Sequence, residues 1–328
     1  MKKIYDCFTF FNELDLLEIR LEEEFEYVDQ FVICESRQTF QGEPKALYFE
    51  QNKDRYQKYL SKINHIIIDE LPKSGNPWDR EHFQRNCLRS AVIDANPQDI
   101  IIISDADEII SPKTLQILRF VDGFIQLDMP MFQYYINLVA QTDGWSKPFA
   151  FTRNLLDEIP DFNFPRTNQD EVFKKFGDKA TKIVQAGWHF TYLGGADQIR
   201  TKLNSFSHTD GWHEFMRNPG AVERHVQIGY VVGNFWHLAR YVPLDTSFPQ
   251  TIIKWQAKPI VTKYLRDIYE AIGAIQDSYR NFDHQGRKLF VQYEQARARY
   301  AALLAQFNLK PFQEENLIDT GNIPPPKA

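Results

Sequence analysis

Four consecutive isoleucines at residues 100–103 are followed, after one serine, by Asp105, Ala106, Asp107 and Glu108. An unbroken β-branched run predicts a strand that is buried on both faces, as in parallel sheets. Such strands end at the edge where open α/β sheets bind ligands. Two aspartates this close repel each other unless a cation or water lies between them. Because hard divalent cations bind both carboxylates and phosphates, the motif predicts a metal and diphosphate site on an α/β protein.

Strand-like and helix-like segments alternate over the first 140 residues. Buried strands are predicted at residues 4–10, 31–34, 65–68 and 100–103. Helices are predicted after Asn12, over residues 53–61, from Asp79, and from Ser111, where a capping serine precedes a proline. This alternation favours an α/β fold with a mainly parallel sheet and right-handed crossovers.

The pattern weakens after residue 140. Residues 141–187 are interrupted by Pro160, Pro165 and Gly177, and are expected to form loops and short strands over the ligand-binding edge. Residues 187–195 predict a strand closed by a glycine turn, and a helix follows with Ile199 and Leu203 facing inward. Two further helices are predicted between residues 261 and 307.

The overall composition narrows the class of protein. A net charge of -6 over 328 residues argues against a broad nucleic-acid-binding surface. Cys7, Cys34 and Cys87 lie in apolar company without CxxC spacing, which favours buried reduced thiols and a reducing compartment. No apolar run is long enough to predict a signal peptide or a membrane span. We therefore expect a cytoplasmic protein, and peripheral contact with the inner face of the membrane stays open.

The three carboxylates of the acidic motif also have a structural interpretation, which is to cap the next helix. Ser111 and Pro112 already supply that helix start, so capping explains at most one acid. The segment by itself leaves a phosphatase-type or kinase-type metal site open. The sequence contains neither a GxxxxGK[ST] phosphate loop nor a GxGxxG fingerprint, which lowers the support for P-loop and dinucleotide-binding proteins.

Several short segments between residues 4 and 210 together carry a family resemblance. They are residues 5–21 (YDCFTFFNELDLLEIRL), 31–36 (FVICES), 39–42 (TFQG), 78–86 (WDREHFQRN), 104–109 (SDADEI), 187–190 (GWHF) and 205–209 (SFSHT). In this order, the segments resemble glycosyltransferase family 17. The family includes the eukaryotic enzyme that adds the bisecting N-acetylglucosamine to N-glycans.

The resemblance implies a GT-A-type fold with a doubly wound, mainly parallel sheet. We expect this domain at residues 1–245, a C-terminal helical extension at 246–310 and a flexible tail at 311–328. The implied reaction moves a sugar, with UDP-GlcNAc as the favoured donor, onto a glycan hydroxyl with inversion at the anomeric carbon. The implied cofactor is Mn²⁺ or Mg²⁺. The expected acceptor is a glycan or a lipid-linked saccharide, such as a bacterial or viral surface polysaccharide, and no nucleic acid is expected as a partner.

By the same resemblance, Asp107 is the direct metal ligand, and Asp105 lies near the ribose or holds a metal-bound water. His189 is a further metal ligand, with His208 as the competing candidate. Both histidines have structural alternatives, since His189 can pack within an aromatic strand and His208 can cap the end of a helix. Glu108 can form a salt bridge, position the acceptor as a catalytic residue, or face solvent.

Other residues are expected to bind the donor. Phe10, Asn12 and Glu13 follow the first strand, where the nucleotide base would lie, although Asn12 is equally suited to cap a helix. Glu35 ends the second strand and could accept hydrogen bonds from uracil or ribose, or could be a surface carboxylate.

Trp78, Arg85 and Asn86 are predicted on the helix before the acidic strand. The guanidinium of Arg85 suits a diphosphate, and its alternative is an ion pair with Glu81 at the i−4 position. Trp78 could stack on uracil, or could be a packing residue. Asn86 is taken as a donor-binding neighbour of Arg85.

An inverting transfer needs a general base, usually a carboxylate, to take the proton of the acceptor hydroxyl. Asp170 and Glu171 are the first candidates, and Asp143 and Asp210 stay open because spacing does not choose among them. Two other classes of protein also remain. A metal-dependent phosphohydrolase or nucleotidyltransferase would need a second acidic cluster, which the sequence does not show. A non-catalytic glycan-binding protein would not need both Asp105 and Asp107.

Overall fold

The computed structural model describes residues 1–140, 144–208, 211–218, 220–233, 237–282 and 290–309. A seven-stranded sheet has the strand order β10-β6-β9-β4-β1-β2-β3. Its strands are β1 (Ile4–Thr9), β2 (Gln30–Ser36), β3 (Ile63–Ile68), β4 (Ile100–Asp105), β6 (Phe124–Leu127), β9 (Phe149–Thr152) and β10 (Ala180–Ile183). Strands β3, β2, β1 and β4 run parallel, and only β9 runs antiparallel to its neighbours β4 and β6. The predicted α/β class with a mainly parallel sheet is confirmed.

A second sheet has five short strands in the order β12-β8-β7-β11-β5. They are β5 (Glu108–Ile110), β7 (Met131–Gln133), β8 (Leu138–Val139), β11 (Gly187–Thr191) and β12 (Arg240–Tyr241). Only Ala106 and Asp107 separate β4 of the large sheet from β5 of the small one. The acidic motif is therefore the turn at which the chain passes from one sheet to the other.

Helices cover both faces of the large sheet. The longer helices are α1 (Leu14–Glu24), α3 (Pro77–Cys87), α4 (Pro112–Leu118), α6 (Gln169–Phe176), α7 (Gly195–Ser205), α8 (Gly211–Met216), α9 (Ala221–Ile228), α12 (Ile268–Phe282) and α13 (Phe290–Gln306). Shorter ones are α2 (Tyr48–Gln51), α5 (Phe164–Thr167), α10 (Gln250–Lys254) and α11 (Pro259–Thr262), with 3₁₀ turns η1 (Lys53–Tyr56), η2 (Leu60–Lys62), η3 (Leu88–Ala91), η4 (Arg153–Glu158) and η5 (Gly177–Lys179).

The isoleucine run of β4 shows why the large sheet is buried on both faces. Ile100 and Ile102 pack into one core cluster with residues of α1 and α4, whereas Ile101 and Ile103 pack into another with residues of η3, η4 and α6. All four side chains are fully buried. Each contributes about 1.5–3 kcal/mol of transfer free energy, so the run fixes β4 at the centre of the sheet.

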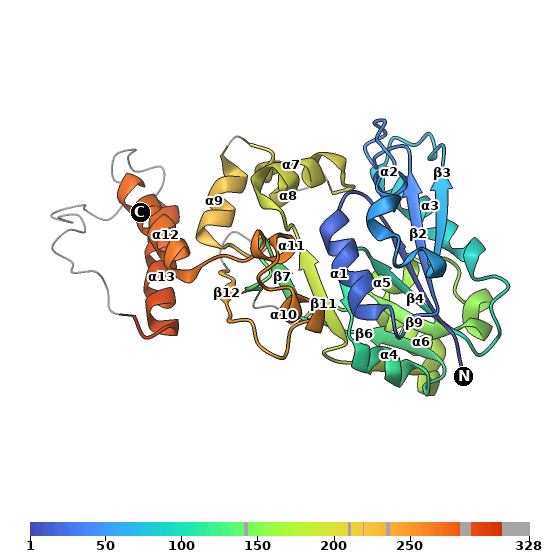
Figure 1. Ribbon diagram of the computed structural model, residues 1–328. Helices are drawn as coiled ribbons and strands as arrows, with labels where there is room; N and C mark the ends of the chain where they lie inside the picture. Colours follow the sequence, from blue (N-terminus) through green and yellow to red (C-terminus); the bar gives the residue numbers. More distant parts are fainter. Residues whose placement is uncertain (141–143, 209–210, 219, 234–236, 283–289, 310–328) are drawn as a thin grey trace.

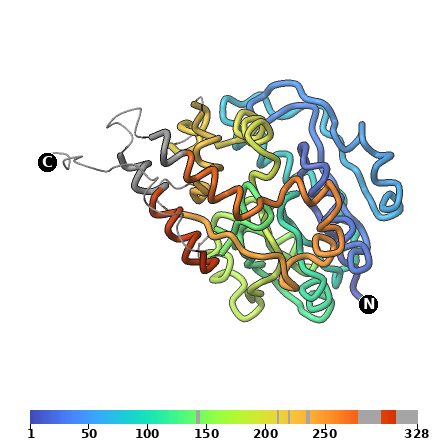
Figure 2. Tube along the Cα trace, turned by 60° about the vertical axis from the view of Figure 1, so that its left-hand side comes forward, coloured from blue at the N-terminus to red at the C-terminus, as the bar shows by residue number. Residues whose placement is uncertain are grey.

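Segments late in the chain return to its beginning. Figure 1 shows α12 and α13 together at the end of the molecule away from the large sheet. In Figure 2 the orange segment before them lies beside the blue α1. The backbone N–H groups of Gln250 and Thr251 donate to Glu23 of α1 at 3.0 and 2.7 Å, and the Tyr264 hydroxyl donates to Asp15 at 2.8 Å. Residues 250–264 are therefore held against the N-terminal helix by buried or half-buried polar contacts.

Several predicted elements differ from the structure. The single helix expected at residues 53–61 is replaced by the two 3₁₀ turns η1 and η2, and α2 precedes them. Asn76, not Asp79, caps α3, because the Asn76 side chain accepts from Trp78 N–H at 3.1 Å and Pro77 occupies the first turn. Asn12 does not cap α1, whose N-cap residue is Glu13 without a side-chain cap.

The largest difference concerns residues 141–187. They supply β9 to the middle of the large sheet, together with α5 and α6, rather than only loops and short strands. Other expectations are confirmed: Ser111 caps α4, and the three cysteines are unpaired, with Cys7 and Cys34 buried. Among the described residues, no helix has both the length and the apolar character needed to span a membrane. Residues 311–328 lie outside the described part of the chain.

Candidate functional site

Hydrogen bonds from neighbouring groups fix the backbone of the acidic turn. The N–H of Asp105 donates to the Glu108 carboxylate at 2.7 Å, and the carbonyl of Asp107 accepts from Phe190 N–H of β11 at 2.8 Å. Buried Arg20 donates to the Asp105 carbonyl at 2.7 Å and forms an ion pair with Asp6 at 2.6 Å. These contacts fix the conformation of the turn, and therefore the directions in which the Asp105 and Asp107 side chains point.

Asp105 is paired with two arginines. One carboxylate oxygen lies 2.9 Å from Arg85 Nη2, and the other accepts a hydrogen bond from Arg166. Burial alone would raise the pKa of Asp105, but Arg166 and Arg85 outweigh it and hold that pKa below its usual range. Both carboxylate oxygens of Asp105 are thus engaged by arginines, and its role beside the ribose or a metal-bound water stays a prediction.

Glu108 is fully buried and does not line the cavity. Its carboxylate accepts from Arg166 at 3.0 and 3.1 Å and from Trp145 Nε1 at 2.5 Å, in addition to the Asp105 N–H. The catalytic role predicted for Glu108 is therefore corrected: of its three alternatives, the structure has the salt bridge. Glu108 anchors β5 to α5 and to Trp145.

Asp107 faces Lys202 and His189. Its Oδ2 lies 2.8 Å from Lys202 Nζ, and its Oδ1 lies 3.6 Å from His189 Nε2. Burial would raise the pKa of Asp107, but Lys202 and His189 outweigh it and hold the pKa far below its usual range. Asp107 is therefore ionised, and its Oδ1 is the carboxylate oxygen of the acidic motif that faces an imidazole nitrogen.

His189 of β11 is placed by stacking on Trp145, with ring centroids 4.4 Å apart and an interplanar angle of 29°. Its Nδ1 is buried and has no hydrogen-bond partner among the described residues. No group of three or more His, Cys, Asp or Glu side chains suited to a metal occurs in the part of the chain that the structure describes. Mg²⁺-type sites often use only one or two protein ligands and complete their coordination with substrate phosphates. Asp107 Oδ1 and His189 Nε2 fit such a site.

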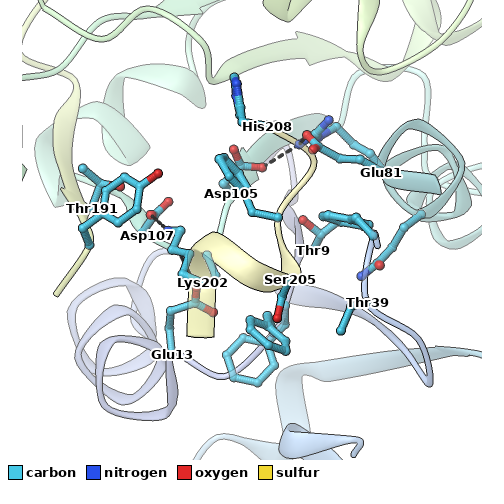
Figure 3. A pocket seen from close by; sticks show the side chains of 18 of the residues that line it. Thr9, Glu13, Thr39, Glu81, Asp105, Asp107, Thr191, Lys202, Ser205 and His208 are labelled. Carbon is cyan, nitrogen blue, oxygen red and sulfur yellow. Dashed lines mark hydrogen bonds and ion pairs between the residues drawn. The ribbon is translucent and has the colours of Figure 1, made fainter. Parts of the chain in front are cut away.

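A cavity of about 280 Å³ opens at this edge of the large sheet. It extends from the ends of β1 and β4 to the small sheet and α7, and Figure 3 shows Asp105, Asp107, Glu13 and Lys202 around it. Its aromatic lining residues are Phe10, Phe11, Phe40, Trp145, Tyr192 and Phe206. Ligand pockets combine such apolar walls with a few polar groups that fix orientation, so this cavity is the candidate site.

A second cavity of about 250 Å³ lies beside the first. The two cavities share Glu13, Asp107, Tyr192 and Lys202 as lining residues. The second cavity is bounded further by the start of α1, by Arg55 and by Lys263. The ion pair of Lys202 with Asp107 therefore lines both cavities.

The structure brings part of the predicted set to the first cavity. Its lining includes Phe10, Glu13, Arg85, Asp105, Asp107, His189 and His208. Asn12 lines the second cavity instead. Arg85 also forms its predicted alternative ion pair with Glu81, at 2.9 Å. The side chain of His208 lies against Trp78, with ring centroids 4.6 Å apart.

Glu35, Trp78 and Asn86 do not line the cavity, and their contact with the donor stays a prediction. Glu35 is fully buried, accepts from Phe49 N–H at 3.1 Å and lies 3.3 Å from His65 Nε2, so it is not a surface carboxylate either. Trp78 packs edge-on against His208. Asn86 accepts from the N–H of Phe162 at 2.8 Å, which fixes the loop before α5.

The candidate general bases are placed differently from the expectation. Asp170 and Glu171 are exposed in the first turn of α6 and do not line the cavity. They are on a helix rather than in a loop, since α6 begins at Gln169. Asp143 and Asp210 lie outside the described residues. Among the described residues, the carboxylates that line this cavity outside the acidic motif are Glu13 and Glu81.

Two cations of the site, Arg166 and Lys202, were not predicted from the sequence. Arg166 lies on the four-residue helix α5, which has no periodicity from which to infer a face. Lys202 follows the inward-facing Ile199 by three positions on α7, so it lies on the buried side of that helix. A lysine at a position that the periodicity assigns to the core was the available signal.

The comparisons with known proteins agree with the resemblance. The sequence model of glycosyltransferase family 17 matches residues 1–262 of this chain. A rat β-1,4-mannosyl-glycoprotein 4-β-N-acetylglucosaminyltransferase is 30% identical over 158 residues, covering 46% of this chain and 26% of the relative. The mouse protein of the same name is 28% identical over 238 residues, covering 64% of this chain and 44% of the relative. The chain thus spans less than half the length of these curated relatives.

Solved structures show weaker similarity. HddC from Yersinia pseudotuberculosis is 12% identical with a TM-score of 0.36, covering 57% of this chain and 92% of that one. Glucosyl-3-phosphoglycerate synthase from Mycobacterium tuberculosis, solved with Mn²⁺, UDP and phosphoglyceric acid, is 12% identical with a TM-score of 0.35, covering 77% and 91%. Similarity at this level does not bear on the site. Because the family match covers residues 1–262, this chain belongs to glycosyltransferase family 17.

Proposed function

We propose that this protein is a metal-dependent, inverting glycosyltransferase that moves N-acetylglucosamine from UDP-GlcNAc onto a hydroxyl of a glycan or lipid-linked saccharide. The observation that carries the proposal is the pairing of Asp107 with His189, 3.6 Å apart, inside an aromatic cavity at the carboxyl ends of β1 and β4. The family membership and the names of the curated relatives support the reaction class and the sugar.

In this proposal Asp107 and His189 would hold Mn²⁺ or Mg²⁺. When bound, the ion would act as a Lewis acid toward the diphosphate of the donor. Arg85 and Arg166 keep Asp105 ionised and immobile beside it, which preserves the geometry of the turn. The aromatic side chains Phe10 and Phe11, next to the end of β1, provide apolar surface for the nucleotide base.

The transfer itself exchanges one bond at the anomeric carbon. The acceptor oxygen bonds to C1 of the sugar, the bond from C1 to the β-phosphate oxygen breaks, and its electron pair leaves with UDP. The acceptor proton passes to a general base. Glu13 and Glu81 are the carboxylates that line the cavity outside the acidic motif in the described part of the chain, so they replace Asp170 and Glu171 as the candidates.

The experiment is a donor-turnover assay that follows release of nucleoside diphosphate from UDP-GlcNAc, other UDP-sugars and GDP-sugars, with Mn²⁺ or with EDTA. We expect turnover of UDP-GlcNAc above the other donors, loss of turnover in EDTA, and a β-configured product from the α-linked donor by NMR. Turnover of none of these donors would contradict the transferase proposal. Full turnover in EDTA would contradict the metal dependence alone.

A further inference from the structure

Lys202 is a charged residue of the site to which neither the family motif nor the metal proposal gives a role. It lies on α7 and lines both cavities, and its side chain is 20% exposed. Its ammonium is 2.8 Å from Asp107 Oδ2 and 3.8 Å from Glu13 Oε1, and lies 5.3 Å from the centre of the Tyr192 ring. Figure 3 shows Lys202 reaching from α7 toward Asp107, above Glu13.

The turn before α7 fixes this position. Tyr192 has a φ of 54°, and Gly194 and Gly195 have φ of 108° and 81°. These left-handed conformations turn the chain sharply from β11 into α7. As a result, His189 of β11 and Lys202 of α7 approach Asp107 from the same continuous segment. The placement of Lys202 beside the acidic turn is thus built into the backbone.

A diphosphate entering this cavity would meet four carboxylates, those of Glu13, Glu81, Asp105 and Asp107. It therefore needs cations that can turn toward it. Such a cation must be able to leave its present carboxylate partner without leaving that buried carboxylate uncompensated.

The other cations of the lining are already engaged. Arg85 is bonded to Glu81 and Asp105 at 2.9 Å each. Lys45 lies 4.0 Å from the fully buried Glu35. By contrast, Asp107, the hydrogen-bonding partner of Lys202, is the carboxylate proposed to bind the metal ion.

We propose that Lys202 is a catalytic residue whose ammonium binds the β-phosphate of the nucleotide-sugar donor, exchanging Asp107 for the phosphate when a divalent ion takes up Asp107. This inference rests on the proposed function. An ammonium has three N–H donors, and Asp107 takes one of them within hydrogen-bonding distance. When the bond from C1 to the β-phosphate oxygen breaks, the electron pair stays on that oxygen. Lys202 keeps its proton and donates a hydrogen bond to the developing charge.

The partner exchange also explains how one carboxylate can serve two cations. Without a donor, the ammonium of Lys202 compensates the buried charge of Asp107. With the donor and metal bound, Asp107 would be compensated by the ion and Lys202 by the phosphate. Neither state leaves an uncompensated buried charge, which would otherwise be strongly unfavourable.

The test compares Lys202→Gln with the wild type in calorimetric binding of UDP, UMP and uridine, with Mn²⁺ present. Loss of one charge-assisted hydrogen bond should weaken UDP binding about 10- to 100-fold. Uridine binding should stay within about twofold, because uridine has no phosphate for Lys202 to contact. Lys202→Arg should recover part of the UDP affinity. Lys174→Gln, which removes an exposed lysine of α6, is the matched control and should leave all three affinities unchanged.

The outcomes separate this inference from the proposed function. Equal weakening of UDP and uridine, or unchanged UDP binding, would overturn the role of Lys202. A wild type that binds UDP no better than uridine would overturn the proposed function. UDP binding that persists in EDTA but falls in Lys202→Gln would support Lys202 and contradict the metal. Binding of Mn²⁺ alone, followed by electron paramagnetic resonance, should not weaken in Lys202→Gln, because Asp107 and His189 remain. If Lys202→Gln does not fold, Lys202→Met, which keeps the aliphatic stem, carries the same comparison.

Discussion

Replacing Arg166 should destabilise the protein far more than replacing a surface arginine. The Arg166 side chain is 7% exposed and is shared between Asp105 and Glu108, and the Glu108 side chain is fully buried. In Arg166→Gln the carboxylate of Glu108 keeps Trp145 Nε1 and the Asp105 N–H as donors but loses the cation in contact with it. A buried charge left without its partner costs about 3–5 kcal/mol. The two remaining donors favour the lower end, so we expect a loss of about 3 kcal/mol.

The assay is urea unfolding followed by circular dichroism, with the change in stability taken from the midpoint at constant m-value. Arg37→Gln is the matched control, because Arg37 and Asp69 form an exposed pair at 2.8 Å with side chains 55% and 79% exposed. Such exposed pairs contribute about 0–1 kcal/mol. A loss in Arg166→Gln no larger than that in Arg37→Gln would refute the account of the buried cluster. A loss several-fold larger, with less added by Glu108→Gln in the Arg166→Gln background than in the wild type, would agree with it.

Two further predictions concern the scaffold around the site. A Cβ at Gly187 would lie 2.0 Å from the Ile109 carbonyl oxygen, so Gly187→Ala should disrupt the β11–β5 pairing and lower the thermal midpoint of unfolding by several degrees. Gly75→Ala is the control, because a Cβ there would have nothing within 4 Å and should change the midpoint little. Equal midpoints in the two variants would contradict the pairing. Burial lowers the pKa of His225 to about 4. Because the unfolded chain binds a proton at His225 near pH 6.5 and the folded chain does not until about pH 4, the stability should fall by about 3 kcal/mol as the pH drops from 6.5 to 4. His225→Phe should remove that part of the slope in urea unfolding, and an unchanged slope would contradict the assignment.

The core of the fold was predictable where the sequence signal is local. The isoleucine run predicted β4 because a strand buried on both faces needs apolar residues at every position. The turn from Asp105 to Glu108 was placed at the ligand-binding edge because it directly follows the end of that buried strand. Ser111 and Pro112 predicted the start of α4, since capping depends on neighbouring residues alone.

The sequence did not predict β9. Its four residues, Phe149 to Thr152, are all buried, but a run this short has no measurable period. Its place between β4 and β6 depends on antiparallel pairing with strands far away in the chain. Such long-range pairing is decided by the whole sheet rather than by local propensity.

The site was predictable in its acids but not in their partners. A carboxylate cluster after a buried strand is a local feature. Its partners are distant in the chain, since Arg166 follows Asp105 by 61 residues and Lys202 follows Asp107 by 95 residues. Those partners change the division of roles: Arg166 binds Asp105 and Glu108 into a structural cluster, and Asp107 stays beside His189 as the candidate metal ligand. For Glu108 the sequence left three roles open, and only the contacts of the folded chain distinguish them.

Asp107 would hold the divalent ion that the diphosphate of a UDP-sugar needs, and calorimetric titration of UDP tests this role most directly. We predict that the wild type and Glu171→Gln, an exposed carboxylate control on α6, bind UDP with Mn²⁺ and lose most of that affinity in EDTA. Asp107→Asn should bind UDP weakly and equally in both conditions while its far-ultraviolet circular dichroism stays native. UDP binding by Asp107→Asn that is as tight and as Mn²⁺-dependent as in the wild type would contradict the claim.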